Sequence, residues 1–172
     1  MKSSIVKQLI PLFVYLLYAS GVMAQKDVNV FAGGNVIIGF AGGDFKNAYS
    51  YATGLDASLG AGLTEKVYVL GTLGYVSYKN EDTNPFGRIT LIPLKAGLRV
   101  YPYKNFFVAG DAGVGFLKDE IMTSRESRFI YDLGIGAHGE LLQMGFYYDG
   151  WKRKNSNGSS NTFQIKLGIA IR

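Results

Sequence analysis

Few residues in this chain of 172 are suited to catalysis or metal binding. His138 is the only histidine and there is no cysteine. A lone His with no Gly-x-Ser-x-Gly element and no recognisable partner does not form a nucleophilic or acid–base site. Zinc would need clustered Cys or His, and the acidic stretch "DEIMTSRESR" lacks the spacing of a calcium loop. We therefore expect no enzyme activity, no metal site and no cofactor.

A second set of residues is suited to electrostatic pairing. Its members are charged side chains that share one face of alternating, glycine-rich segments: Asp56, Lys95, Arg99, Asp111, Asp132, Asp149, Lys166 and Arg172. Acids and bases balance in number. If this face lines an enclosed space, unpaired charges would be costly there. We therefore predict an ion-pair network in that space, with Arg172 at its rim.

The elements that must position these residues are strands. No segment after residue 25 keeps apolar residues at helical spacing, whereas eight segments alternate apolar with small or polar residues. These segments are 28–40, 51–63, 67–78, 88–101, 106–117, 128–138, 141–151 and 161–172. Each is long enough for a tilted strand to cross a bilayer, which takes ~9–11 residues.

The connections between the segments strictly alternate in length. Three are tight, at 64–66, 102–105 and 139–140, and four are long and polar, at 41–50, 79–87, 118–127 and 152–160. All tight turns then lie at one end of an up-and-down meander, as in outer-membrane barrels. The sequence predicts an all-β fold, an eight-stranded antiparallel up-and-down transmembrane β-barrel.

The makeup of the two faces indicates which one points inward. Except in the less regular segments 28–40 and 67–78, one face of each segment is almost purely aliphatic and aromatic, as a lipid-facing band must be. The opposite face is rich in Gly, which suits a narrow interior better than an exposed strand surface. The alternative is a soluble, lipocalin-like barrel with its apolar face inward. For the hairpin at 102–105, the membrane interpretation predicts Lys95 directly across from Asp111.

Residues 1–24 have the layout of a secretory signal peptide. Lys2 and Lys7 precede an apolar run, and Val22-Met23-Ala24 forms a cleavage site. The run is shorter than the ~20 residues of a membrane helix. The mature chain, 25–172, is then one domain. The signal carries two lysines and no acid, so the net charge of +5 falls to +3, too small to indicate nucleic-acid binding.

The mature chain resembles the small outer-membrane β-barrel proteins of the OmpA-transmembrane and OmpX type, in the family called outer membrane protein beta-barrel domain. The similarity rests on "GLDASLGAGL", "FVAGDAGVGF" and "YYDGW" and extends over 25–172. It implies an outer-membrane location, a structural or surface-interaction role through the long loops, and contact with membrane lipid and with the barrel-assembly machinery. Such proteins often end in an aromatic residue, whereas this chain ends in Arg172.

The stretch "WKRKN" suggests a lipid contact. Trp151 is expected to anchor at the membrane interface, while Lys152, Arg153 and Lys154 reach the phosphates of lipopolysaccharide. A simply hydrated loop is the alternative.

An interior of eight strands is just wide enough for side chains to fill it. We therefore expect a filled lumen, with a narrow channel or a small-ligand or lipid-binding barrel as alternatives.

Overall fold

The computed structural model describes residues 29–47, 49–79, 88–119, 125–152 and 159–172. The predicted signal peptide lies outside these residues. The described elements, in chain order, are β1 (Val30–Gly42), the short 3-10 helix η2 (Gly43–Asn47), β2 (Tyr51–Thr64), β3 (Val67–Lys79), β4 (Ile89–Tyr103), β5 (Phe106–Asp119), β6 (Arg125–His138), β7 (Leu142–Lys152) and β8 (Ser159–Ile171). Within the described part of the chain, no helix is long and apolar enough to span a membrane.

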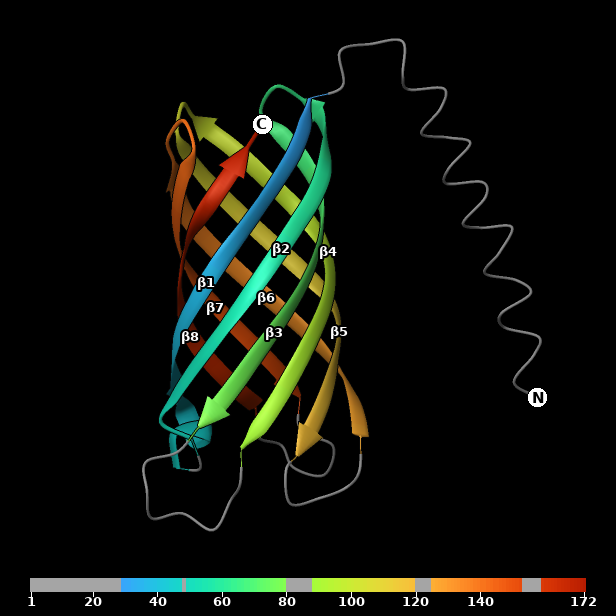
Figure 1. Cartoon of the computed structure of the whole chain (residues 1–172), viewed down its shortest axis with the longest axis vertical. Helices are drawn as coiled ribbons and strands as arrows, with labels where there is room; N and C mark the ends of the chain where they lie inside the picture. Colours follow the sequence, from blue (N-terminus) through green and yellow to red (C-terminus); the bar gives the residue numbers. More distant parts are fainter. Residues whose placement is uncertain (1–28, 48, 80–87, 120–124, 153–158) are drawn as a thin grey trace, which may run out of the picture.

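The eight strands form a closed barrel (Figure 1). Each strand pairs antiparallel with the next, and β8 pairs with β1 through contacts from Ala32↔Ile171 to Gly42↔Asn161. Closure leaves no strand edge without a partner, which is required of any sheet that crosses a bilayer. The prediction of an eight-stranded up-and-down antiparallel barrel is confirmed.

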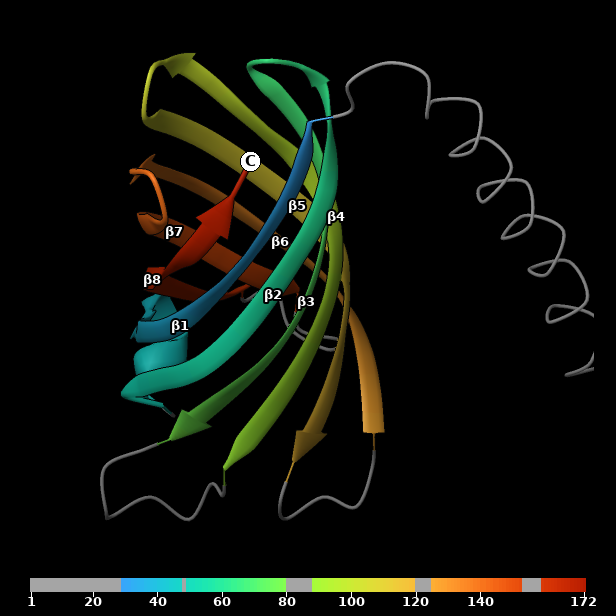
Figure 2. The ribbon, with the colours of Figure 1, turned by 45° about the horizontal axis from the view of Figure 1, so that its top comes forward.

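The two ends of the barrel differ in the length of the connections between strands. The tight connections β2–β3, β4–β5 and β6–β7 lie at one end, here called the turn end, together with the end of β8 (Figures 1 and 2). The other end is called the loop end, and there η2 sits against the mouth of the barrel (Figure 2). The backbone of η2 lies beside β8 and β1.

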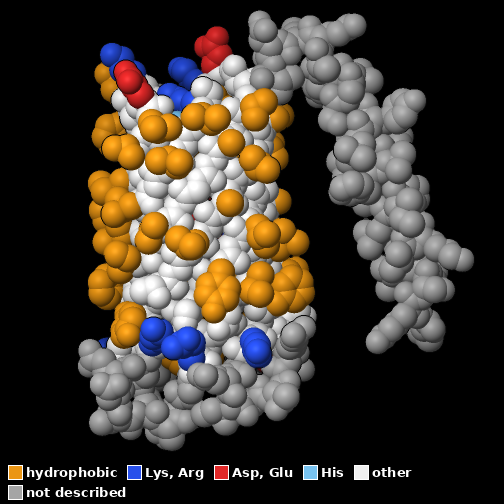
Figure 3. Space-filling view, viewed as in Figure 1, with side chains coloured by type: hydrophobic (Ala, Val, Ile, Leu, Met, Phe, Trp, Pro, Cys, Tyr) orange, Lys and Arg blue, Asp and Glu red, His pale blue; other side chains and the backbone are white. Residues whose placement is uncertain are grey.

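Large apolar side chains are spread over the outer surface of the barrel, from near the turn end to near the loop end of the face in Figure 3. On β2, Leu55 and Leu59 are 60% and 68% exposed, whereas Asp56 between them is 7% exposed. The same alternation holds on the other strands for which the sequence predicted it. A band of apolar surface this extensive requires apolar surroundings.

Strands β1 and β3 alternate less clearly because they also carry apolar residues on the inner face. Phe31 and Ile37 of β1 and Tyr68 and Leu70 of β3 are all buried inside the barrel. They belong to two apolar clusters, one near each end of the lumen. Where a strand contributes apolar side chains to the closure of one end of the barrel, its inner face is not purely polar. The alternation of apolar and polar residues along that strand then does not identify the inner face.

The predicted pairing of Lys95 with Asp111 was wrong by two residues. The structure pairs Lys95 with Gly113, and Asp111 with Gly97. Only Lys104 and Asn105 form the turn, and the register shifts between Val100 and Tyr103. A shift of two positions leaves both side chains on the inner face, so the predicted orientation is retained while the predicted partner is not.

Candidate functional site in the lumen

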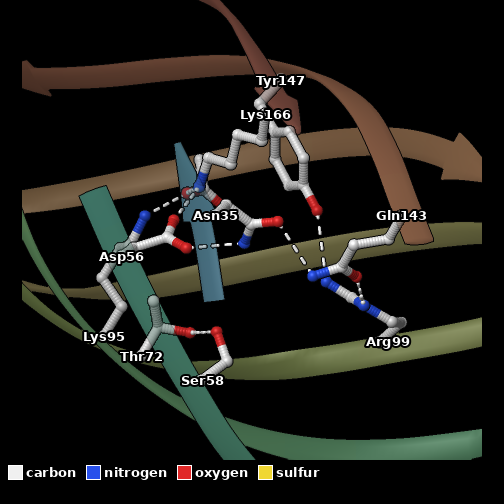
Figure 4. A network of polar contacts seen from close by, with 10 residues as sticks. Asn35, Asp56, Ser58, Thr72, Lys95, Arg99, Gln143, Tyr147 and Lys166 are labelled. Carbon is white, nitrogen blue, oxygen red and sulfur yellow. Dashed lines mark hydrogen bonds and ion pairs between the residues drawn. The ribbon is translucent and has the colours of Figure 1, made fainter. Parts of the chain in front are cut away.

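The middle of the lumen contains a buried ion-pair tier (Figure 4). Lys166 Nζ lies 3.0 Å from Asp56 Oδ2 and 3.5 Å from Asp132 Oδ2. Lys95 Nζ forms a second ion pair with the same Asp132 oxygen. All four side chains are at most 5% exposed. The four residues lie on β2, β4, β6 and β8, no two of which are neighbours, so these bonds cross the lumen rather than follow the wall.

Two neutral amides extend this tier toward the turn end (Figure 4). Asn35 Nδ2 donates to Asp56 Oδ1 at 2.6 Å, and Gln143 Nε2 donates to Asn35 Oδ1 at 2.9 Å. Arg99 then donates to Gln143 Oε1 at 2.7 Å and to the Tyr147 hydroxyl at 3.4 Å. Asn35 and Gln143 were not among the predicted members of the network, because the prediction rested on charged side chains alone. Their inward positions in alternating strands could have indicated them.

Arg99 closes the turn end together with aromatic rings. Its guanidinium carbon lies 4.6 Å from the centre of the Phe31 ring and 4.2 Å from that of Phe107. A guanidinium group placed between two rings gains a cation–π interaction while its edge remains free to donate hydrogen bonds. Tyr68 and Tyr101 pack edge-on around the same rings. The turn end is therefore filled by side chains from the strands themselves.

His138 belongs to this closure. Its Nε2 lies 3.2 Å from the Ala170 carbonyl oxygen, and its Nδ1 lies 3.0 Å from the Tyr101 hydroxyl. A carbonyl oxygen only accepts, so Nε2 carries the proton and Nδ1 accepts from Tyr101 in the neutral ring. The side chain is 1% exposed. Because both ring nitrogens have hydrogen-bond partners, the His138 side chain contributes to the packing of the turn end.

The loop end is closed by a different aromatic cluster. Phe45, carried by η2, packs against Tyr49 at 4.9 Å, Trp151 at 5.1 Å and Tyr78 at 5.4 Å between ring centres. Tyr78 and Trp151 also contact each other at 5.2 Å. This set of four rings is called the loop-end cluster below.

The prediction that Trp151 anchors at the membrane interface was therefore wrong. Trp151 is 4% exposed and points into the lumen. The reason is strand parity, since Trp151 lies on the same face of β7 as the inward residues Tyr147 and Asp149. Of the basic residues that follow, the Lys152 side chain and all of 153–154 lie outside the described part of the structure.

Glycine provides the space for these inward side chains. A Cβ atom at Gly97 would overlap with Asp111 Oδ1 and the adjacent backbone, and one at Gly136 would overlap with the Phe107 ring. At Gly134 it would overlap with the Tyr147 ring. The interior of a barrel this narrow has no room for large side chains at every inward position. The many glycines of the sequence thus serve the packing of the lumen.

The remaining charged residues of the predicted network are placed differently. Asp111 and Asp149 face the lumen, but neither forms an ion pair with a described residue. Arg172 lies exposed at the turn end, where its guanidinium carbon is 3.9 Å from the Tyr101 ring centre and it donates to the Lys104 carbonyl oxygen. The structure thus joins Asp56, Lys95, Asp132 and Lys166 by ion pairs and connects Arg99 through neutral groups. Among the described residues, no three metal-ligating side chains converge on one point.

Comparison with known proteins identifies the fold. No family model and no curated protein matches the sequence. Among solved structures, Neisserial surface protein A matches with a TM-score of 0.57 and 11% identity, covering 85% of this chain and 99% of that one. The N-terminal barrel domain of Pseudomonas aeruginosa OprF matches with a TM-score of 0.54 and 16% identity, covering 82% and 97%.

A third match is Ail, the attachment invasion locus protein of Yersinia pestis. Its TM-score is 0.51 and its identity 12%, and the alignment covers 84% of this chain and 97% of Ail. Similarity at these identities concerns the path of the backbone. The chain has the fold of the small, eight-stranded outer-membrane β-barrels.

Proposed function

We propose that this protein is an integral outer-membrane barrel with a lumen closed by its own side chains, and that its role is structural or is exerted through its long loops. One observation carries this proposal. The apolar residues of the barrel point outward and the ion-paired residues point inward, which is the arrangement of a barrel surrounded by lipid. Insertion by the barrel-assembly machinery follows from the same proposal.

The orientation of the faces weighs against a soluble, lipocalin-like barrel. Such a barrel holds its ligand against an apolar interior. Here Leu59 and Leu142 point outward at 68% and 70% exposure, while Lys95, Asp132 and Lys166 point inward. The lumen therefore offers an apolar ligand no apolar cavity along the middle of the barrel.

Closure at both ends weighs against an open channel. Arg99 and its surrounding rings fill the turn end, and the loop-end cluster fills the other end. Between them, the ion-pair tier crosses the lumen. We therefore expect little sustained current when the folded protein is inserted into planar bilayers.

The test of this function is a membrane assay. The protein should fractionate with the outer membrane, resist carbonate washing and migrate anomalously in gel electrophoresis until boiled. Recovery in the soluble periplasm would refute the membrane proposal. Large, stable channels in planar bilayers would refute the closed lumen.

A basic rim at the loop end supports contact with anionic lipid. Lysine and arginine side chains gather between the apolar band and the loops (Figure 3). The described ones that are exposed include Lys46, Arg88 and Lys118. In the outer leaflet, the phosphates of lipopolysaccharide would meet such a rim. The test is insertion into vesicles with and without lipopolysaccharide: stabilisation that fades with added salt supports the contact, and none contradicts it.

A further inference from the structure

Three aspartates lie side by side on the inner wall. The register places Asp111 of β5 directly across from Asp132 of β6, and Asp132 directly across from Asp149 of β7. Directly opposed residues have Cβ atoms ~4.5–5.5 Å apart. Asp132 and Asp149 are 1% and 3% exposed, and Asp111 is partly exposed. These residues are called the carboxylate row.

The cations beside the row are too few to neutralise it. Lys95 and Lys166 both approach Asp132 Oδ2, and Lys166 is shared with Asp56. Arg99 is engaged at the turn end by Gln143 and two rings. From the turn-end closure, Arg99 included, to the loop-end cluster, the described inward charges are four carboxyl groups and three cationic groups: Asp56, Asp111, Asp132, Asp149, Lys95, Arg99 and Lys166. One negative charge is left over if all four carboxyl groups ionise.

The contact between Asp111 and Asp132 indicates where that charge is removed. The register sets their side chains directly opposite each other on the inner wall, with Cβ atoms ~4.5–5.5 Å apart, so a small rotation can bring the two carboxyl groups together. Two ionised carboxylates can only accept, so a hydrogen bond between them requires a proton on one of them. Two carboxyl groups this close do not both ionise. In addition, the Oδ1 atoms of Asp111, Asp132 and Asp149 have no hydrogen-bond partner among the described atoms.

We propose that the carboxylate row is a proton-binding site that holds one proton at neutral pH, shared between Asp111 and Asp132. Asp111 then donates a hydrogen bond to ionised Asp132, and three negative charges face three positive ones. Gly97 keeps Asp111 in this position, because a Cβ there would overlap with Asp111 Oδ1. The other titratable groups that surround the row are Asp56, Tyr78, Lys95, Arg99, Tyr147 and Lys166.

The direct test is infrared spectroscopy at neutral pH of the protein folded in an alkyl maltoside detergent, which has no ester carbonyl. The carbonyl stretch of a protonated carboxylic acid is separate from the carboxylate and amide bands. The wild type should show this stretch, Asp111→Asn should lack it, and the matched control Asp149→Asn should retain it. The Asn amide can donate to Asp132 as the protonated acid does, so Asp111→Asn should fold.

Three results would overturn the proposal. One is a wild type without the stretch at neutral pH, and a second is a stretch that persists in Asp111→Asn and disappears in Asp149→Asn. The third is a melting temperature that changes between sodium and potassium salts at fixed pH, which would assign the missing charge to a bound metal cation.

A pH series gives an independent readout. A folded barrel that holds a proton which the unfolded chain has released loses stability as the pH rises. The melting temperature of the wild type should therefore fall between neutral and alkaline pH, and that of Asp111→Asn should change less. Equal slopes for the two proteins would contradict the shared proton.

Discussion

At the turn end, Arg99 lies between Phe31 and Phe107, and its guanidinium donates to Gln143 and Tyr147. At the loop end, the central ring, Phe45, comes from the 3-10 segment η2 rather than from a strand. The turn end is thus closed by the barrel wall itself, while the loop end is closed by a segment added to it.

The hydroxyl and imidazole groups at the two ends differ in the same direction, although Arg99 Nε at the turn end also has no partner among the described atoms. Near the turn end, both ring nitrogens of His138 and the Tyr101 hydroxyl have partners. Near the loop end, the Tyr78 hydroxyl and the Thr162 hydroxyl have none among the described atoms. The comparison indicates that the turn end is fixed together with the strand register, whereas the loop end can open without breaking the barrel wall.

The largest loss of stability should come from the tier that joins the two ends. Lys166→Met leaves Asp56 without its cation and removes one of the two cations near Asp132, and stranding a buried charge costs about 3–5 kcal/mol. Urea unfolding in vesicles measures the change in the free energy of unfolding. The exposed Lys66→Met is the control and should change it by less than about 0.5 kcal/mol. Equal effects of the two variants would mean that water screens the tier.

Substitution of Arg99 tests the turn end. Arg99→Met should lower the free energy of unfolding by about 2–4 kcal/mol, since a hydrogen bond to a charged group contributes about 1.5–3 kcal/mol and no charge is left buried. Arg128, which pairs with partly exposed Glu126, is the control, and Arg128→Met should cost less than about 1 kcal/mol. If Arg99→Met and Arg128→Met lowered the free energy of unfolding by the same amount, Arg99 would not stabilise the turn end.

Substitution of Phe45 tests the loop end. An enclosed Phe→Ala costs about 3–5 kcal/mol, but because η2 lies outside the wall we expect only about 1–2 kcal/mol of global stability to be lost. Trp151 is the only tryptophan, so its fluorescence reports this end selectively. Phe45→Ala should shift its emission to the red and expose it to soluble quenchers.

The control for that experiment is Phe116→Ala on the outer face, where Phe116 is 49% exposed. Its Trp151 emission should match that of the wild type. A Phe45→Ala protein whose emission is unchanged would show that Phe45 does not shield the loop end.

The smallest effects come from a matched pair of hydroxyl deletions. Tyr101→Phe removes the hydrogen bond to His138 and should cost about 1 kcal/mol, while Tyr78→Phe removes a hydroxyl without a described partner and should cost close to nothing. Thermal melts of both variants in one detergent provide the measurement. A reversed order would contradict the difference between the ends.

The strand pattern allowed the barrel and its inner face to be predicted. Alternation between side chains such as Leu55 and Asp56 depends only on local geometry, so it could be read from the chain. The alternating connection lengths gave the topology for the same reason. The orientation of Lys95 and Lys166 followed from these two observations.

The features that could not be predicted depend on turn geometry and on contacts between residues far apart in the sequence. The partner of Lys95 changed because the turn at Lys104, with φ 28°, is tighter than its sequence suggested and the register shifts beside it. The inward orientation of Trp151 follows from strand parity, but its ring contact with Phe45 of η2, far away in the sequence, does not. Asn35 and Gln143 complete the network through contacts across the lumen that no spacing along one strand encodes.

The chain of polar contacts begins and ends on the same strand. It runs from Lys95 on β4 through β6, β8, β2, β1 and β7, and returns to Arg99 on β4. No hairpin or partial sheet can satisfy these groups, because their partners come from strands that meet only when β8 reaches β1. Any partly assembled intermediate in a bilayer therefore carries unpaired charges at high cost. Insertion and closure should accordingly be a single concerted step, and unfolding should be all-or-none.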